Sequence, residues 1–245
     1  MQVWEELGSL ARLAPTPHNT QPFRIVPRGP ERADLVLLTD RLLPREDHGN
    51  LYVVSAFGIF TATLERAARH FGYEVTVEPV AALDPDSLEA RGPRILLGEA
   101  RVTGRRAAAP QADALDARRT SRLPYQDRAL DPDALGAFGA IAAASGHRFI
   151  HHGDPEVVGP LLRLNAEAII DNLRLGDERE EIRRWTRLGP TPAFGDGLWK
   201  GPMNQPAWEL WSAFAVPWLF RLPGMRQLAI KRYLTTQRGT RRSKS

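Results

Sequence analysis

The chain has 245 residues, of which 42% are hydrophobic, and it contains no cysteine. This length and apolar content predict a folded protein with a sizeable core, arranged as one large domain or two small ones. The absence of cysteine excludes disulfides, thiolate nucleophiles and thiolate metal ligands. It also suits a reducing compartment, and we expect a cytoplasmic protein.

The formal net charge of +4 is distributed unevenly. Residues 205–245 carry eight Lys or Arg against a single acid, Glu209. We interpret this basic tail as a solvated chain end, with nucleic acid or anionic lipid as alternative partners.

Neither end of the chain predicts a membrane-spanning or secretory segment. The first residues lack a basic stretch followed by an apolar run, so we expect no signal peptide. The most apolar late stretch, residues 210–220, is broken by Pro217 and has about half of the roughly 20 residues that a span needs. An interfacial or lid segment remains an alternative for it.

The first elements predicted along the chain are a helix and a hairpin. Apolar residues recur at helical spacing over residues 3–14, and Pro15 with Pro17 should end that helix. Two β-like runs follow at residues 23–26 and 33–39, separated by a Pro- and Gly-containing turn.

A long helix is predicted over residues 51–71, with Gly72 as its C-terminal cap. Its first three turns are apolar nearly all round, so we expect it to be buried on most sides, in a domain core or at a subunit interface. Residues 73–80 and 93–100 predict two further strands. A short helical run is expected over residues 112–118.

The second half of the chain is predicted to be mainly helical. Asp131 and Pro132 begin an Ala-rich helix. Residues 147–152 (HRFIHH) predict a strand. Asp154 and Pro155 open an amphipathic helical region whose start Gly159 and Pro160 should delay or kink.

The order of helices and non-alternating strands predicts an α+β layer fold. Residues 188–206 are rich in Gly and Pro and predict a long irregular loop, as found in lids and binding loops. We therefore expect a main domain over residues 1–187, a lid candidate over 188–206, and an apolar helix with a basic tail over 207–245.

Several common catalytic motifs are absent from the sequence. No GxGxxG follows a strand, and neither GxxxxGK[ST] nor GxSxG occurs. His151 and His152 would point to opposite faces of a strand, so they could not share a metal without a bulge. His48 beside Asp47 gives a similarly weak metal signal, and we interpret His70 as part of a helix end. We expect no metal site.

Two polar segments remain as candidates for chemistry. The first, APTPHNTQPF over residues 14–23, combines three prolines with hydrogen-bonding side chains, more than is needed to end a helix. The second, ARRTSRLPYQD over residues 117–127, places three arginines around Thr120 and Ser121. Guanidinium groups and small hydroxyls suit phosphate because they donate several hydrogen bonds to its oxygens, although a solvated basic turn is the alternative.

Together, these segments resemble the two signatures of the FMN-dependent nitroreductase family. PTPHNTQPF is similar to its Pro, Ser/Thr, Asn-Ser/Thr-Gln-Pro-aromatic signature, and RRTSRLPY to its Arg-Arg-Ser-x-Arg-x-aromatic signature. Their order is reversed relative to most members, which is typical of a divergent subgroup. The Asp-Arg pair at residues 40–41, the long helix and the following Gly-Tyr extend the resemblance over about residues 5–125.

The resemblance implies a fold, a cofactor and an assembly. Nitroreductase-like proteins have an α+β three-layer fold with a mainly antiparallel central sheet flanked by helices, and they form homodimers that hold FMN at the interface. The implied activity is ping-pong hydride transfer from NAD(P)H through the flavin to a nitroaromatic, quinone or similar acceptor. We expect no catalytic acid or nucleophile, because the flavin carries the chemistry.

The resemblance also implies roles for residues in both segments. Arg118 and Thr120 would contact the phosphate and ribityl chain, with Arg119 beside them, and Arg122 would lie near the N1/O2 edge of the flavin. Pro15, Thr16 and Asn19 would face the flavin, with Gln21 in the same loop. The alternatives are a turn asparagine for Asn19 and a structural bond to the loop backbone for Gln21. The cofactor-binding set is therefore Pro15, Thr16, Asn19, Gln21, Arg118, Arg119, Thr120 and Arg122.

Family members complete the site with a later strand and a glycine-containing helical segment. We expect either that the chain is truncated before this part or that Arg238, Arg241 and Arg242 take its place. A protein that sequesters FMN without NAD(P)H turnover is the alternative function, suggested by the lid candidate. A nucleic-acid binder using the basic tail is a third hypothesis.

Overall fold

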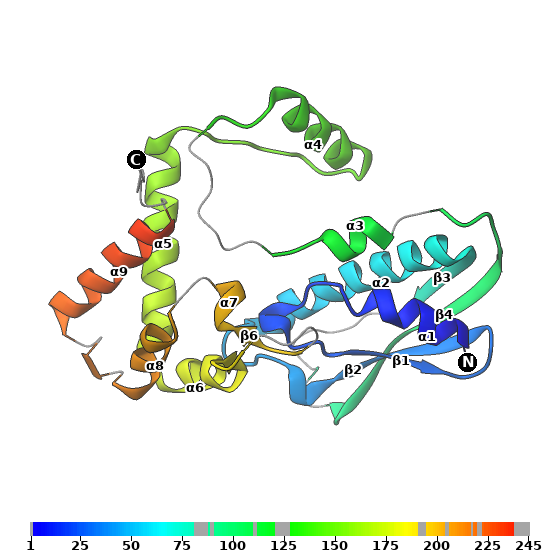
Figure 1. Cartoon of the computed structure of the whole chain (residues 1–245), viewed down its shortest axis with the longest axis horizontal. Helices are drawn as coiled ribbons and strands as arrows, with labels where there is room; N and C mark the ends of the chain where they lie inside the picture. Colours follow the sequence, from blue (N-terminus) through cyan, green and yellow to red (C-terminus); the bar gives the residue numbers. More distant parts are fainter. Residues whose placement is uncertain are drawn as a thin grey trace. The chain divides into compact units, whose positions relative to one another are not determined.

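The computed structural model describes residues 2–80, 88, 91–109, 112–120, 128–190, 195–203, 206–216, 218–219 and 222–237. The chain divides into two compact units, whose elements are labelled in Figure 1. Unit 1 comprises Met1–Ser121 and Glu180–Gln205, and unit 2 comprises Arg122–Arg179 and Pro206–Ser245. The functional boundaries expected at residues 187 and 206 stay a prediction.

Unit 1 contains a four-stranded antiparallel sheet with the strand order β1-β2-β4-β3. The hairpin of β1 and β2 is confirmed, and β4 pairs with both β2 and β3. A second, two-stranded parallel sheet pairs β5 with β6. The elements of unit 1 are α1 (Gln2–Ala11), β1 (Phe23–Pro27), β2 (Arg32–Leu38), α2 (Leu51–Phe71), β3 (Tyr73–Pro79), β4 (Arg94–Arg105), α3 (Ala112–Ala117), β5 (Thr186–Arg187), β6 (Leu198–Trp199) and α7 (Lys200–Met203).

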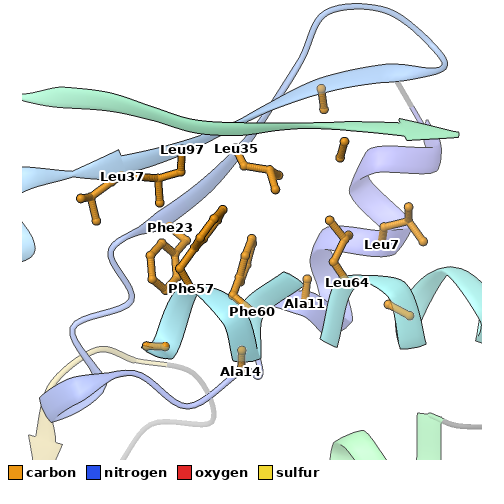
Figure 2. Close-up of a cluster of buried hydrophobic side chains, with 14 of the residues drawn as sticks. Leu7, Ala11, Ala14, Phe23, Leu35, Leu37, Phe57, Phe60, Leu64 and Leu97 are labelled. Carbon is orange, nitrogen blue, oxygen red and sulfur yellow. The ribbon is translucent and has the colours of Figure 1, made fainter. Parts of the chain in front are cut away.

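The core of unit 1 lies between the sheet and the helices α1 and α2 (Figure 2). Alternate residues of β2, namely Ala33, Leu35 and Leu37, are buried, as a strand with one core-facing side requires. Phe23 from β1 packs against two phenylalanines of α2, with ring centroids 5.6 Å from Phe57 and 5.2 Å from Phe60. These long-range contacts hold the loop between α1 and β1 at the edge of a rigid core.

A bulge in β4 adapts the sheet to this core. Leu35 pairs with Gly98 and Val36 with Leu96, so Leu97 is an extra residue that turns into the core. A Cβ on Gly98 would lie 2.7 Å from the backbone oxygen of Glu78. Glycine therefore permits β3 to approach the bulge closely.

Helix α2 has the predicted bounds, and Gly72 caps it with φ 76°. One face packs on the core through residues such as Phe57, Phe60 and Leu64. The expected burial on most sides is not met within the chain, because the opposite face is exposed. That face is formed by Leu51, Tyr52, Ser55, Gly58, Ile59 and Ala62.

Helix α1 ends earlier than its apolar pattern predicts. The pattern continues to Ala14, but the helix ends at Ala11 and residues 12–14 form a tighter turn, with Leu13 N donating to Leu10 O and Ala14 N to Ala11 O. Ala14 is still buried. The turn delivers Pro15 at the start of the polar loop.

Unit 2 is helical in its described parts and has a small core. Buried Ala166 and Ile170 of α5 pack against Ile230 of α9. Asp131 caps α4 and Asp154 caps α5, in both cases by accepting a hydrogen bond from the backbone N–H two residues later. Its helices are α4 (Pro132–Ala144), α5 (Pro155–Arg174), α8 (Ala207–Ala215) and α9 (Pro223–Gln237), and α6 (Gly176–Trp185) spans the boundary between the units.

Three local predictions are wrong. Residues 147–152 form no strand; they are exposed, and no described segment offers them a backbone ladder. The expected delay of helix α5 is absent, because the helix begins at Pro155 and contains Pro160, and the kink expected as the alternative stays a prediction. The predicted irregular loop 188–206 contains two short ordered elements, β6 and α7.

The mixture of helices with an antiparallel sheet confirms the α+β class. The three-layer nitroreductase-like arrangement stays a prediction. Among the described residues, no helix combines the length and apolarity that crossing a bilayer requires.

Candidate functional site

The polar loop between α1 and β1 is built on a tight turn over Pro17–Asn19. Asn19 N donates to Thr16 O and Gln21 N to the Thr16 hydroxyl, at 2.9 and 3.0 Å. His18, Asn19 and Gln21 all have positive φ, at 46°, 53° and 49°. A left-handed conformation costs a non-glycine residue about 1 kcal/mol, so the surrounding bonds must compensate for three such residues.

The side-chain amides of this loop bind a segment that follows much later in the chain. Asn19 Nδ2 donates to Gly195 O at 2.9 Å and to Gly197 O at 3.2 Å. Gln21 Nε2 donates to Gly195 O at 2.9 Å, and Gly197 N returns a bond to Asn19 O at 3.0 Å. We call residues Gly195–Gly197 the glycine strap. The alternative expected for Gln21 was a structural bond to the backbone of its own loop, whereas its amide binds the backbone of the glycine strap.

Asp196 fastens the middle of the glycine strap. Its carboxylate oxygens lie 3.1 Å from Arg41 Nη1 and 3.2 Å from Arg187 Nη2. Arg41 also donates to Thr20 O at 2.7 Å, so one guanidinium joins the loop to the strap. The indole of Trp199 donates to Asp196 O at 2.9 Å.

Gly197 is the position at which the strap depends on glycine. Its φ is 82°, and an added Cβ would lie 2.5 Å from the backbone oxygen of Trp185. Both the conformation and the space therefore exclude a side chain there.

Three arginine side chains, two of which bind Asp196, surround the ring of Trp185. The guanidinium carbons of Arg41, Arg184 and Arg187 lie 5.9, 5.5 and 5.7 Å from the ring centroid. The indole is buried, and its Nε1 has no hydrogen-bond partner among the described residues. The ring thus offers its electron-rich face to three cations, of which Arg41 and Arg187 also share Asp196 as a counterion.

Two further charged groups have shifted pKa values near this cluster. Burial, and then the positive charge of Arg41, lowers the pKa of Arg24, whose guanidinium donates to Gln21 O at 2.9 Å. Burial raises the pKa of Glu181, although the carboxylate accepts hydrogen bonds from the backbone N–H groups of Arg45 and Glu46. Both groups hold backbone that flanks the polar loop or α2.

The second predicted segment begins where α3 ends. Arg118 Nη2 donates to Leu13 O at 3.0 Å, and Arg118 Nη1 lies 3.4 Å from the Thr120 hydroxyl. Arg119 binds the backbone oxygens of Asp116 and Arg118. The side chains of Arg118, Arg119 and Thr120 are exposed. Arg122, Arg238, Arg241 and Arg242 lie outside the described residues.

The structure brings the two predicted segments together only in part. Arg118 reaches Leu13, two residues before Pro15, although 105 positions separate them in the sequence. No hydrogen bond or ion pair within the described ranges joins Arg118, Arg119 or Thr120 to Thr16, Asn19 or Gln21. Asn19 and Gln21 instead turn toward the glycine strap.

Sequence reasoning missed three residues of this arrangement, Asp196, Arg187 and Trp185. One signal was available for the strap, since the Gly-Asp-Gly at residues 195–197 predicts a turn with a polar tip. Arg41 was noted only as part of an Asp-Arg pair. Within the described residues, no group of three or more His, Asp or Glu is arranged to hold a metal ion.

No protein-family model matches this chain, and a search of curated proteins finds no match either.

Proposed function

We propose that the chain is a cytoplasmic FMN-dependent oxidoreductase of the nitroreductase type. The observation that supports this is the bond from Arg118 to Leu13, which joins the arginine segment to the start of the HNTQP loop. The resemblance requires both segments at one site. Without such a contact, the two motifs would be unrelated turns.

The donors of the arginine segment suit the phosphate end of FMN. A guanidinium has five N–H donors, and the bonds to Leu13 and Thr120 use two of those on Arg118. Its exposure, together with Arg119 and the Thr120 hydroxyl, leaves donors accessible to phosphate oxygens.

The amides of Asn19 and Gln21 can bind the flavin ring only if they first release the glycine strap. The Asn19 and Gln21 amides bind the carbonyls of Gly195 and Gly197, which are acceptors of the same kind as the polar edge of an isoalloxazine ring. We propose that the glycine strap moves aside, or lies over the ring, when FMN is bound.

The chemistry that FMN supplies when bound is hydride transfer from NAD(P)H to a nitroaromatic, quinone or similar acceptor. In this proposal Arg118, Arg119 and Thr120 hold the phosphate and ribityl chain. Pro15, Thr16 and Asn19 flank the ring. The role near the N1/O2 edge that the resemblance implies for Arg122 falls outside the described residues and stays a prediction.

A homodimer belongs to the same proposal. The face of α2 that carries Leu51, Tyr52, Ser55, Gly58, Ile59 and Ala62 has no charged side chain and is exposed within the chain. Small residues at Ser55, Gly58 and Ala62 would allow a partner helix to approach closely. This supports the use of α2 as a subunit interface.

The deciding experiment is reconstitution with FMN, followed by anaerobic addition of NADH or NADPH. We expect a yellow protein whose flavin absorbance bleaches on reduction and returns when a nitroaromatic or quinone is added. A colourless protein that does not bind added FMN contradicts the proposal.

Arg118→Ala tests the phosphate assignment. Loss of a charge-assisted bond should cost about 1.5–3 kcal/mol, which is a roughly ten- to hundredfold weaker FMN affinity. Arg94→Ala is the control, because Arg94 is also exposed but lies at the start of β4. Equal FMN affinity of the two variants would refute the assignment.

Sequestration of FMN without turnover is the second candidate. The observation that favours it is the strap itself, since bonds from Asn19 and Gln21 hold Gly195 over the predicted ring-facing residues. Bound FMN that neither NADH nor NADPH reduces would favour sequestration over the enzyme.

A further inference from the structure

Three of the six tryptophans of the chain are concentrated and exposed in unit 2. Trp208, Trp211 and Trp218 are 63%, 61% and 59% exposed, whereas Trp4 and Trp185 in unit 1 are 2% and 4% exposed. An indole is large and mostly apolar, so its exposure has a free-energy cost unless another surface covers it. The clustering of three indoles within eleven positions marks an interaction surface.

Two of the indoles lie on one face of α8. Trp208 and Trp211 are three residues apart on α8 and therefore share one side of the helix, which exposed Ala215 continues. Ala213 is buried on the other side. Leu222 and Leu228, 48% and 57% exposed, add aliphatic surface in the following segment. We call Trp208, Trp211, Trp218, Leu222 and Leu228 the indole surface.

The segment that carries the indole surface is basic in its sequence. Glu209 is the only acid among residues 205–245, and Arg232 of α9 forms an ion pair with it. Asp171, on the neighbouring helix α5, is likewise paired with Arg226 and Arg174. Glu167 of α5 also acts on the charge of Arg226, and Lys231 is exposed. The segment over residues 205–245 keeps an excess of positive charge, because its eight Lys or Arg outnumber its single acid.

We propose that the indole surface binds the interface of an anionic phospholipid bilayer. Indoles are favoured at the level of lipid headgroups, where the ring is partly buried and its N–H remains hydrated. Basic side chains beside them are attracted to anionic headgroups. The exposed indoles and the one-sided charge point independently to the same partner.

Helix α8 is too short to cross a bilayer, so its binding would be peripheral. Nine helical residues make α8 about 14 Å long, less than half of the roughly 30 Å hydrocarbon thickness of a bilayer. The helix therefore lies in the interface plane.

The residues favour lipid over single-stranded nucleic acid. Arg232 already lies over the ring of Trp208, 5.6 Å from its centroid, so its guanidinium occupies one of the two faces on which a base could stack. Leu222 and Leu228 offer surface to acyl chains but no flat face to a base. Basic charge alone would attract either an anionic bilayer or a nucleic acid.

Flotation of the full chain with lipid vesicles tests the proposal. At about 0.05 M salt we expect binding to phosphatidylcholine vesicles containing about 30% phosphatidylglycerol, and at least tenfold weaker binding to pure phosphatidylcholine. Tryptophan emission should shift to shorter wavelength on binding, because indoles leave water. A wild-type chain that does not float with anionic vesicles overturns the proposal.

Replacing the indoles without changing the net charge tests their contribution to vesicle binding. Trp208→Ala combined with Trp211→Ala should weaken flotation at least tenfold, whereas Phe138→Ala, which removes a 50% exposed aromatic of α4, should not change it. Circular dichroism checks that the double alanine variant is folded. If that variant unfolds, Trp208→Phe combined with Trp211→Phe takes its place, and its binding should lie between that of the wild type and that expected for the alanine pair. Unchanged flotation of a folded double variant, or single-stranded DNA that displaces the protein from vesicles, contradicts a lipid-binding indole surface.

Discussion

Asn19 and Gly195 are 176 positions apart in the sequence, and the side-chain amide of one donates to the backbone carbonyl of the other at 2.9 Å. The bond closes the polar loop with the segment predicted as a lid. Because the acceptors are backbone carbonyls, the contact depends on the path of the strap rather than on any side chain of Gly195 or Gly197.

Replacing Asn19 separates its hydrogen bonds from its backbone strain. Asn19→Gly removes both amide bonds to the strap but accepts a positive φ, whereas Asn19→Ala adds about 1 kcal/mol of left-handed strain. Limited proteolysis should cut residues 188–206 faster in both variants than in the wild type. Urea unfolding should show the alanine variant as the less stable of the two. Wild-type protease resistance of Asn19→Gly contradicts the role of the amide.

Gly197→Ala should destabilise unit 1 by more than about 2 kcal/mol, since its Cβ would lie 2.5 Å from Trp185 O at a φ of 82°. Gly189→Ala is the matched control. Its Cβ would meet only the Trp199 ring at 3.8 Å, so a change within about 0.5 kcal/mol is expected. Thermal unfolding of the two variants measures the difference, and equal midpoints would show that the strap tolerates a side chain there.

Much of the backbone, but little of the site, follows from the sequence. The limits of α2 and the glycine that caps it are local properties, and so are the Asp131 and Asp154 caps. Residues 147–152 (HRFIHH) include Phe149 and Ile150, which favour strands, yet a strand requires a partner, and that requirement is not local. The partners of Asn19 and Gln21 were unpredictable for a related reason: backbone carbonyls have no side-chain signature, and the contact spans most of the chain.

Asp47 holds the start of α2, a role that its position beside His48 did not reveal. It is 3% exposed, and its two carboxylate oxygens accept from Tyr52 N and Val53 N at 2.8 and 2.9 Å. Asp47→Ala should lower the free energy of unfolding by about 2 kcal/mol, because two helix donors lose their acceptors.

Two comparisons make the Asp47 prediction specific. Asp47→Asn keeps one acceptor oxygen and should lose less stability than Asp47→Ala. Asp131→Ala removes an exposed cap of the same kind in α4 and should cost about 0.5–1 kcal/mol. Chemical denaturation measures all three, and a smaller loss for Asp47→Ala than for Asp131→Ala contradicts the assigned role.

The contact between α5 and α9 should depend on pH in the acid range. Hydrogen bonds from Arg226, and then from Arg174, lower the pKa of Asp171 to about 2. The unfolded value is about 3.9, so the ion pair stabilises unit 2 above about pH 4 and loses its effect as the pH falls to about 2. Carboxyl NMR titration should show the Asp171 pKa rising toward its ordinary value in Arg226→Gln. An unchanged pKa in this variant would mean that Arg226 is not the main cause.

The separation of Asn19 from Gly195 also sets an order of events during synthesis. At about 5–20 residues per second, a ribosome needs roughly 9–35 s to add the 176 residues between them. Throughout that interval the Asn19 and Gln21 amides of the nascent chain have no strap to bind and remain hydrated. A small ligand that needs these donors therefore meets them while translation is still in progress, before the protein supplies its own carbonyls.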